Sequence, residues 1–360
     1  MGKVAAIKAP FPYFGGKGRV APDVWRRFGD VPNYVEPFFG SGAVLLSRPH
    51  EPKTETVNDL DGWLTNFWRA VRQDPDRVAA WADYPVSELD LHARGDWLFY
   101  REEAADFVER LRADPEFCCF KSAGWWLWGA CSWIGTGWGP RQLPHVGNAG
   151  MGVNRKLPHV GNAGRGVNRQ LPHVGNAGMG VNRQLPHVGN AGMGVNRQLP
   201  HVGDAGRGER EEVRDALKEY MRALGSRMRR VRVVCGDWSR VTGPSVTVRH
   251  GATAVFLDPP YGEGEMDYAA GGNATSVARD AQAWAIEAGG DPAMRVAFCG
   301  YEGSFDFPPS WECFAWKNRG GYGSQGEGDG RANAARERIW FSPYCHKLGH
   351  GLFDHLEDTP

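Results

Sequence analysis

The clearest chemical potential in the sequence lies in four consecutive residues, Asp258, Pro259, Pro260 and Tyr261. Two prolines in a row fix the backbone φ angle and remove two N–H donors, so the loop is stiff and its carbonyl groups point outward as acceptors. The Asp258 carboxylate beside the Pro259 carbonyl is a pair of acceptors suited to an amino group. The ring of Tyr261 adds a flat face for stacking. Residues 254–257 are apolar and predict a buried strand directly before this loop.

A second candidate site is the glycine-rich turn after the predicted strand 34–38. Gly40 and Gly42 occupy this turn, and the apolar residues 43–46 then predict the start of a helix. Glycines let the backbone approach a ligand closely, and the start of a helix favours polar or negative groups. The spacing differs from the G-x-G-x-x-G pattern of dinucleotide folds, so an ordinary strand-to-helix turn is the alternative.

Two further segments carry polar residues that could bind a ligand. Asp59 follows a second predicted strand, 55–57, where an acidic residue of an α/β fold can hold ribose hydroxyls. The alternative for this residue is a cap on the helix that residues 60–70 predict. Near the N-terminus, Gly15 and Gly16 allow a close turn from which Lys17 projects a positive charge.

The elements that must position these residues alternate along the chain. An apolar stripe in residues 213–228 predicts a helix, and apolar runs predict strands at 231–235, 253–257 and 295–299. Residues 311–316 and 336–341 could pair as antiparallel strands around a glycine-rich loop. Alternating strands and helices predict an α/β fold with a mostly parallel sheet, and the last two strands would form its antiparallel edge.

Together and in this order, the four motifs resemble the Dam-like family of adenine-N6 DNA methyltransferases. The family order is a Gly-Gly-Lys element, a cofactor loop, a recognition region and an Asp-Pro-Pro-Tyr motif. Here these are residues 15–17, 36–42, about 62–230 and 258–261. Cys235-Gly-Asp-Trp238 and residues 336–340 resemble two further family elements. Tyr13 stands where the family often has tryptophan, and Ser342 where it commonly has asparagine.

The resemblance implies a Rossmann-like methyltransferase sheet, mostly parallel with an antiparallel edge strand, and an inserted helical or loop recognition region. The implied reaction transfers a methyl group from S-adenosylmethionine to the N6 amine of an adenine flipped out of double-stranded DNA. Residues 258–261 would be catalytic. The cofactor would be bound by Tyr13, Lys17, Glu36, Phe38, Gly40, Gly42, Asp59, Asp237 and Asp258. No metal is needed for this chemistry.

The resemblance and the sequence also divide the chain. Residues 1–61 and 231–345 would form the S-adenosylmethionine-binding catalytic domain, residues 62–230 the target-recognition region, and residues 346–360 a tail. Within the recognition region, residues 143–208 repeat the unit LPHVGNAGMGVNRQ with a period of 14. Residues 141–208 carry eight positive charges and one negative charge, so this arm could contact DNA phosphates. The proposed contacts are Arg141, Arg155 and Arg169, and the alternative is a solvated loop.

Composition limits the other classes. The 42 Lys and Arg residues balance the 42 Asp and Glu residues, which excludes a globally basic protein. Seven cysteines without C-x-x-C spacing argue against a disulfide framework or a cysteine zinc site and predict a cytoplasmic location. No apolar run is long enough to predict a membrane span. Family habit predicts a monomer, and a partner restriction nuclease is left open.

Two alternatives and one local prediction remain. Methylation of cytosine N4 would use the same fold and the same amine chemistry. A non-catalytic DNA-binding protein, with the repeats as its working part, belongs to a different class. Five tryptophans fall within residues 124–138, and Trp125–Trp128 are predicted to lie on a buried helix rather than on an aromatic surface for bases.

Overall fold

A computed structural model describes seven stretches of the chain, residues 6–13, 16–101, 104–114, 116–132, 211–260, 274–316 and 336–348. The repeat region lies outside these residues, as do Gly15, Tyr261, Arg141, Arg155 and Arg169. The chain divides into two compact units. One unit consists of residues 1–9, 15–61 and 230–360, and the other of residues 10–14 and 62–229.

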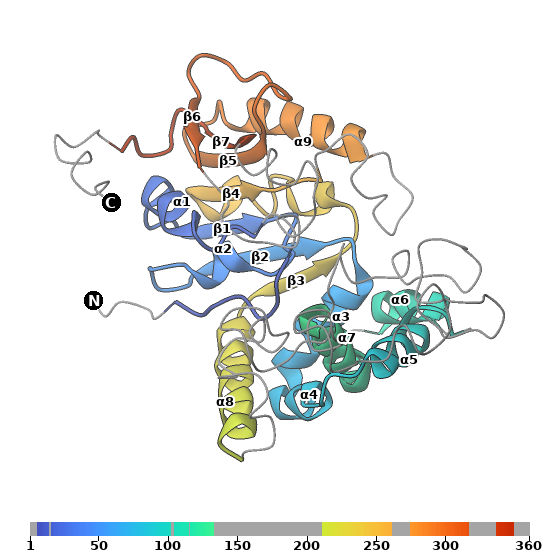
Figure 1. Cartoon of the computed structure of the whole chain (residues 1–360). Helices are drawn as coiled ribbons and strands as arrows, with labels where there is room; N and C mark the ends of the chain where they lie inside the picture. Colours follow the sequence, from blue (N-terminus) through green and yellow to red (C-terminus); the bar gives the residue numbers. More distant parts are fainter. Residues whose placement is uncertain are drawn as a thin grey trace, which may run out of the picture. The chain divides into compact units, whose positions relative to one another are not determined.

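The first unit contains a seven-stranded sheet in the order β3-β2-β1-β4-β5-β7-β6 (Figure 1). The strands are β1 (Asn33–Glu36), β2 (Thr54–Asp59), β3 (Arg232–Cys235), β4 (Thr253–Leu257), β5 (Met294–Tyr301), β6 (Glu312–Ala315) and β7 (Glu337–Phe341). The first five strands in this order are parallel, whereas β7 runs antiparallel to both β5 and β6. The predicted α/β class, the mostly parallel sheet and its antiparallel edge are therefore confirmed.

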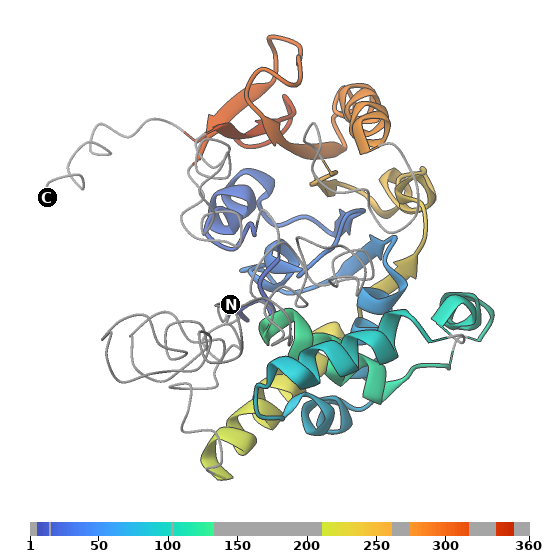
Figure 2. The same ribbon diagram turned by 45° about the vertical axis from the view of Figure 1, so that its right-hand side comes forward.

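Every residue of the central strands β1 and β4 is buried because both faces of the sheet are covered. Helix α1 (Ala21–Phe28) covers one face, where the Trp25 ring lies 4.9 Å from the Tyr34 ring of β1. The short helix α2 (Ala43–Leu46) joins it there, since the Trp25 indole donates to the Val44 carbonyl at 2.7 Å. Helix α9 (Ala274–Ala288) lies on the opposite face, where Ala281 and Ala285 pack into the core cluster of β4 and β5 (Figures 1 and 2).

The second unit is helical in its described residues. It contains α3 (Gly62–Gln73), α4 (Pro75–Ala82), α5 (Glu88–Phe99), α6 (Ala104–Ala113), α7 (Phe120–Ser132) and α8 (Glu211–Met228). Helix α7 packs against α3, α4 and α5. At Gly124 a Cβ atom would lie 2.7 Å from the backbone carbonyl carbon of Trp81, so only glycine allows this approach to α4.

The tryptophan-rich helix is buried over most of its length, as predicted, although Trp125 is only half-buried. Trp126 and Trp128 are fully or almost fully buried, and the Trp128 indole donates to the Tyr84 carbonyl at 2.9 Å. Residues 10–13 belong to this unit, and Phe11 meets Trp126 edge-on with ring centroids 4.9 Å apart. Within the described residues, no helix is both long and apolar enough to cross a membrane.

Candidate active site

The sheet order places two of the predicted motifs side by side. Strands β1 and β4 are neighbours and parallel, with Asn33 opposite Thr253 and Val35 opposite Val255. Their carboxyl ends therefore lie at the same edge, where Glu36 ends β1 and Asp258 follows β4. The chain proceeds from β1 to β2 and β3 on one side and from β4 to β5 on the other. This is the switch point of an α/β sheet, where ligands are usually bound.

The turn after β1 needs glycine at two positions. Gly40 has φ 48° and Gly42 has φ 67°, in the left-handed region that other residues rarely adopt. A Cβ atom on Gly42 would lie 2.6 Å from the Phe39 ring. The Gly42 N–H donates to the Phe39 carbonyl at 2.9 Å, so the chain folds back tightly before α2 begins. The turn thus brings bare backbone to the carboxyl edge of the sheet.

Asp59, at the end of β2, holds this turn from the neighbouring strand. Its Oδ2 accepts from the Gly40 N–H at 2.9 Å and its Oδ1 accepts from the Asp61 N–H at 3.0 Å. Burial raises the pKa of Asp59 to about 7, although the backbone donors of Asp61, Gly40 and Leu60 act in the opposite direction. Asp59 is therefore both a support of the turn and a carboxyl group that titrates near neutral pH.

The preceding residue, Asn58, supports the site through contacts that the sequence did not assign to it. Its side-chain Nδ2 donates to the Pro37 carbonyl at 3.0 Å and to the Gly236 carbonyl at 2.9 Å. The Asn58 carbonyl accepts from the Phe39 N–H at 2.9 Å. Asn58 therefore ties together the loops that leave β1, β2 and β3. Its place at a strand end beside Asp59 was the available signal.

Phe38 and Asp237 occupy the loops after β1 and β3. The Phe38 ring stacks on Trp238 with centroids 6.0 Å apart. Asp237 is exposed, and its Oδ1 accepts from the Ser239 N–H at 3.0 Å, so it caps the 3-10 turn Trp238–Val241. A predicted contact of Asp237 with the cofactor stays a prediction, because a local capping role accounts for this geometry.

Lys17 and Asp258, which stand far apart in the sequence, form an ion pair. The Lys17 Nζ lies 3.0 Å from Asp258 Oδ2 and 3.7 Å from Glu337 Oε2. The Lys17 carbonyl accepts from the Ala21 N–H at 2.9 Å, which fixes the residue at the start of α1. Burial alone would lower the pKa of Lys17, but the charges of Asp258 and Glu337 outweigh it and raise that pKa. Lys17 therefore remains a cation at neutral pH.

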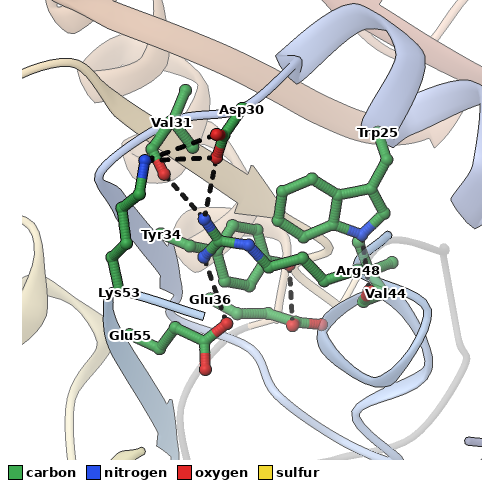
Figure 3. A network of polar contacts seen from close by, with 9 residues as sticks. All are labelled: Trp25, Asp30, Val31, Tyr34, Glu36, Val44, Arg48, Lys53 and Glu55. Atoms are coloured by element: carbon green, nitrogen blue, oxygen red, sulfur yellow. Dashed lines mark hydrogen bonds and ion pairs between the residues drawn. The ribbon is translucent and has the colours of Figure 1, made fainter. Parts of the chain in front are cut away.

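Glu36 links this cluster to a second polar network. Burial raises the pKa of Glu36 well above its ordinary value, and the nearby Asp258 charge acts in the same direction. The Tyr34 hydroxyl donates to Glu36 Oε2 at 2.8 Å. Figure 3 shows this pair beside the buried Arg48, whose guanidinium contacts Glu55 at 3.1 Å. Glu36, from which the glycine turn begins, is thus held in place by the Tyr34 hydroxyl.

The structure brings together most of the predicted site residues of the first unit. Lys17, Glu36 and Asp258 share one cluster, and Gly40 shares another with Asp59. Pro259 is buried and Pro260 is half-buried directly after Asp258. Tyr13 belongs to the helical unit, so its contact with the cofactor stays a prediction. Tyr261 and the three arginines of the repeat region lie outside the described residues.

Comparison with known protein families gives one match. Residues 13–114 match the family described as D12 class N6 adenine-specific DNA methyltransferase. The matched segment contains Lys17, the glycine turn and Asp59, and it ends before Asp258. A comparison with curated proteins gives no match. The match supports, over residues 13–114, the predicted resemblance to a family of enzymes that methylate adenine in DNA.

Proposed function

We propose that this chain, which matches a family of N6 adenine-specific DNA methyltransferases over residues 13–114, transfers a methyl group from S-adenosylmethionine to the N6 amine of a flipped-out adenine. One observation carries the proposal. The rigid Asp258–Pro259 corner and the glycine turn after β1 leave neighbouring parallel strands at the same edge of the sheet. An amine acceptor pair and a cofactor turn on adjacent strands are the two parts that this reaction requires.

The residues at this edge fit the proposed cofactor. The positive φ angles of Gly40 and Gly42 expose backbone where a side chain would block close approach. A carboxylate has about four acceptor sites, and backbone donors of Gly40, Leu60 and Asp61 use three at Asp59. The remaining site can accept from a ribose hydroxyl. S-adenosylmethionine would supply a methyl group made electrophilic by its sulfonium.

The Asp258–Pro259 corner would activate the amine. The N6 lone pair is delocalised into the adenine ring, which makes N6 a poor nucleophile. The Asp258 carboxylate and the Pro259 carbonyl can accept its two N–H bonds and favour a pyramidal nitrogen. The lone pair then forms the N–C bond as the C–S bond breaks, with the bonding electrons left on sulfur. The excess proton on N6 leaves to Asp258 or to water. Positioning and electrostatics provide most of the acceleration.

The remaining roles concern DNA. The N6 atom lies inside a duplex, so the base must be flipped out before it can react. We propose that Tyr261 stacks on the flipped adenine, which would contribute about 1–3 kcal/mol by analogy with single-strand stacking. Target recognition is proposed for residues 62–230, with Arg141, Arg155 and Arg169 contacting phosphates. The family match favours adenine over cytosine N4 as the target.

The proposal is tested at Asp258. Asp258→Ala removes one acceptor of the amine, and turnover should fall by about a thousandfold, while calorimetry still detects S-adenosylmethionine binding. Transfer is measured with labelled cofactor on DNA, and digestion to nucleosides with mass detection identifies the methylated base. The matched control is Asp280→Asn, an exposed carboxylate on α9. Near-normal turnover in Asp258→Ala, or N4-methylcytosine as the product, would contradict the proposal.

A further inference from the structure

The structure adds a residue that no motif assigned to the reaction. We propose that Glu337, the first residue of β7, is a positioning residue that acts on Asp258 through the Lys17 ammonium. The inference rests on the proposed role of Asp258 as an acceptor for the amine. Glu337 itself need not touch either substrate.

The topology explains how Glu337 reaches the site. Parallel strands β1, β4 and β5 end at the carboxyl edge of the sheet, and β7 runs antiparallel to β5, so its first residue lies at that same edge. In the register of this pair, Glu337 lies opposite Tyr301 and Ile339 lies opposite Cys299. Side chains alternate along a strand, so Glu337 shares the face of Ile339 and Cys299. Glu337, which lies late in the chain, is therefore brought next to Lys17, which precedes the first helix.

The contacts and the burial agree with a shared role. Lys17 and Glu337 are each only 4% exposed, whereas the Asp258 side chain is 20% exposed. Asp258 is thus the residue of the three that is exposed enough to contact a substrate, whereas Lys17 and Glu337 are buried. A buried charge is strongly unfavourable unless it is paired, so Glu337 and Lys17 depend on each other. The Lys17 Nζ also lies 5.7 Å from the centre of the Trp316 ring.

The charges of the three residues suggest what Glu337 contributes. Lys17 and Asp258 alone would make a neutral pair, and Glu337 brings the sum of the three to −1. The proposed reaction moves positive charge from the donor sulfur toward N6, so a corner with net negative charge favours the transition state. Without Glu337, the Lys17 ammonium would cancel the charge of the acceptor that it holds in place.

Two titratable groups near this cluster, Glu36 and Cys299, do not add to the sum. Burial raises the pKa of Glu36 on β1 and of Cys299 on β5 well above their ordinary values, which favours the neutral form of each. Arg338 follows Glu337 in β7, and its guanidinium contacts the Glu302 carboxylate at 2.5 Å. Glu337 therefore provides the second negative charge beside Lys17.

Two substitutions test the inference because they act in opposite directions. Glu337→Gln removes a like charge near Asp258, so the acid limb of the pH–rate profile should move to lower pH. Lys17→Met removes the opposite charge and should move it to higher pH. We expect the plateau rate of Glu337→Gln to fall about tenfold. The double variant restores the sum of −1 and leaves neither charge buried without its partner, so its acid limb should lie near that of the wild type.

A second readout needs neither cofactor nor DNA. In protein labelled at aspartate carboxyl carbons, the NMR signal of Asp258 is assigned by its loss in Asp258→Asn and followed with pH. Its titration midpoint should fall in Glu337→Gln and rise in Lys17→Met. Glu337→Asp keeps the charge and should restore most of the rate. Glu302→Gln removes a carboxylate that is 62% exposed on its side chain and should leave rate and midpoint unchanged.

The outcomes separate this inference from the proposed function. If Asp258→Ala is inactive but Glu337→Gln leaves the rate, the acid limb and the midpoint unmoved, the positioning role is overturned and the proposed reaction stands. If Asp258→Ala keeps its turnover, the proposed role of Asp258 fails, whatever the Glu337 variants do. If Glu337→Gln does not fold, the double variant and Lys17→Met still decide the matter, because an unshifted limb in Lys17→Met overturns the coupling.

Discussion

Two buried cations of the sheet-containing unit, Arg48 and Lys17, each lie near two carboxylates, but the two clusters are assembled differently. Arg48 contacts Glu55 at 3.1 Å and Asp30 at 3.8 Å, all within one short stretch of chain (Figure 3). Lys17 gathers Asp258 and Glu337 from strands near the other end of the sequence.

The difference lies in what each cluster leaves accessible. The Arg48 guanidinium also donates to the Val31 carbonyl at 2.6 Å, and its innermost carboxylate, Glu55, is 1% exposed. The guanidinium of that cluster is therefore surrounded by the backbone before β1 and by a carboxylate of β2. In the Lys17 cluster, the carboxylate at 3.0 Å is the partly exposed Asp258 on a stiff loop. The buried ion pair thus encloses its carboxylate in one case and leaves a carboxylate partly exposed in the other, and this exposed carboxylate is the one proposed to act on the amine.

The largest expected effect separates the two clusters by stability. Arg48→Met leaves Glu55 buried without its cation, so the free energy of unfolding should fall by about 3–5 kcal/mol. Lys53→Met is the matched control, because Lys53 is half exposed and contacts Asp30 at 3.4 Å. It should change the free energy of unfolding by less than about 1 kcal/mol. Urea denaturation measures the free energy of unfolding of both variants. Equal decreases would contradict the stabilising role of Arg48.

A smaller effect concerns the turn that follows Glu36, whose pKa is raised by burial and by the charges of Asp258 and Glu55. Gly42→Ala adds a Cβ atom 2.6 Å from the Phe39 ring at φ 67°, and should destabilise the fold by about 1–3 kcal/mol. Because the turn is proposed to hold the cofactor, S-adenosylmethionine affinity should fall as well.

Gly303→Ala provides the control for backbone strain alone. Gly303 has φ 78° and a Cβ atom there would meet nothing within 4 Å. Its loss of stability should be about 1 kcal/mol, with unchanged cofactor affinity. Equal effects of the two substitutions on calorimetric affinity would show that the turn at Gly42 has no particular role in binding.

The sequence predicted the parts of this site that depend on local signals. The glycine turn follows from Gly40 and Gly42, and the Asp258 corner follows from two prolines after an apolar run. Alternating apolar runs also predicted the parallel sheet and its antiparallel edge, which the structure confirms. Each of these features is encoded within a few neighbouring residues.

The sequence could not predict the contacts that depend on strand register. Glu337 reaches Lys17 because β7 is antiparallel to β5, and a shift of one residue would turn its side chain to the other face. Asn58 crosses between loops that are far apart in the chain, since one of its partners is the Gly236 carbonyl. A carboxylate or an amide in an ordinary strand carries no local sign of such a partner.

Asp59 offers the test with the smallest expected effect. Backbone N–H groups hold its carboxylate, whereas a cation holds the carboxylate of Asp258. Burial raises the folded-state pKa of Asp59 from 3.8 to about 7, so the folded protein binds this proton more tightly than the unfolded chain. The contribution of Asp59 to stability is therefore greatest below pH 4 and is lost as the pH rises through 7.

Cofactor binding should follow the opposite trend, because a ribose hydroxyl is proposed to donate to the ionised form of Asp59. We expect S-adenosylmethionine affinity to rise about tenfold between pH 6 and pH 8, with uptake of the ligand releasing a proton near pH 6. Calorimetry in buffers of different ionisation enthalpy measures both quantities. Asp59→Asn should bind more weakly at pH 8 and lose the pH dependence, whereas Asp280→Asn should retain it. A flat affinity in the wild-type protein would show that Asp59 serves the turn and not the ribose.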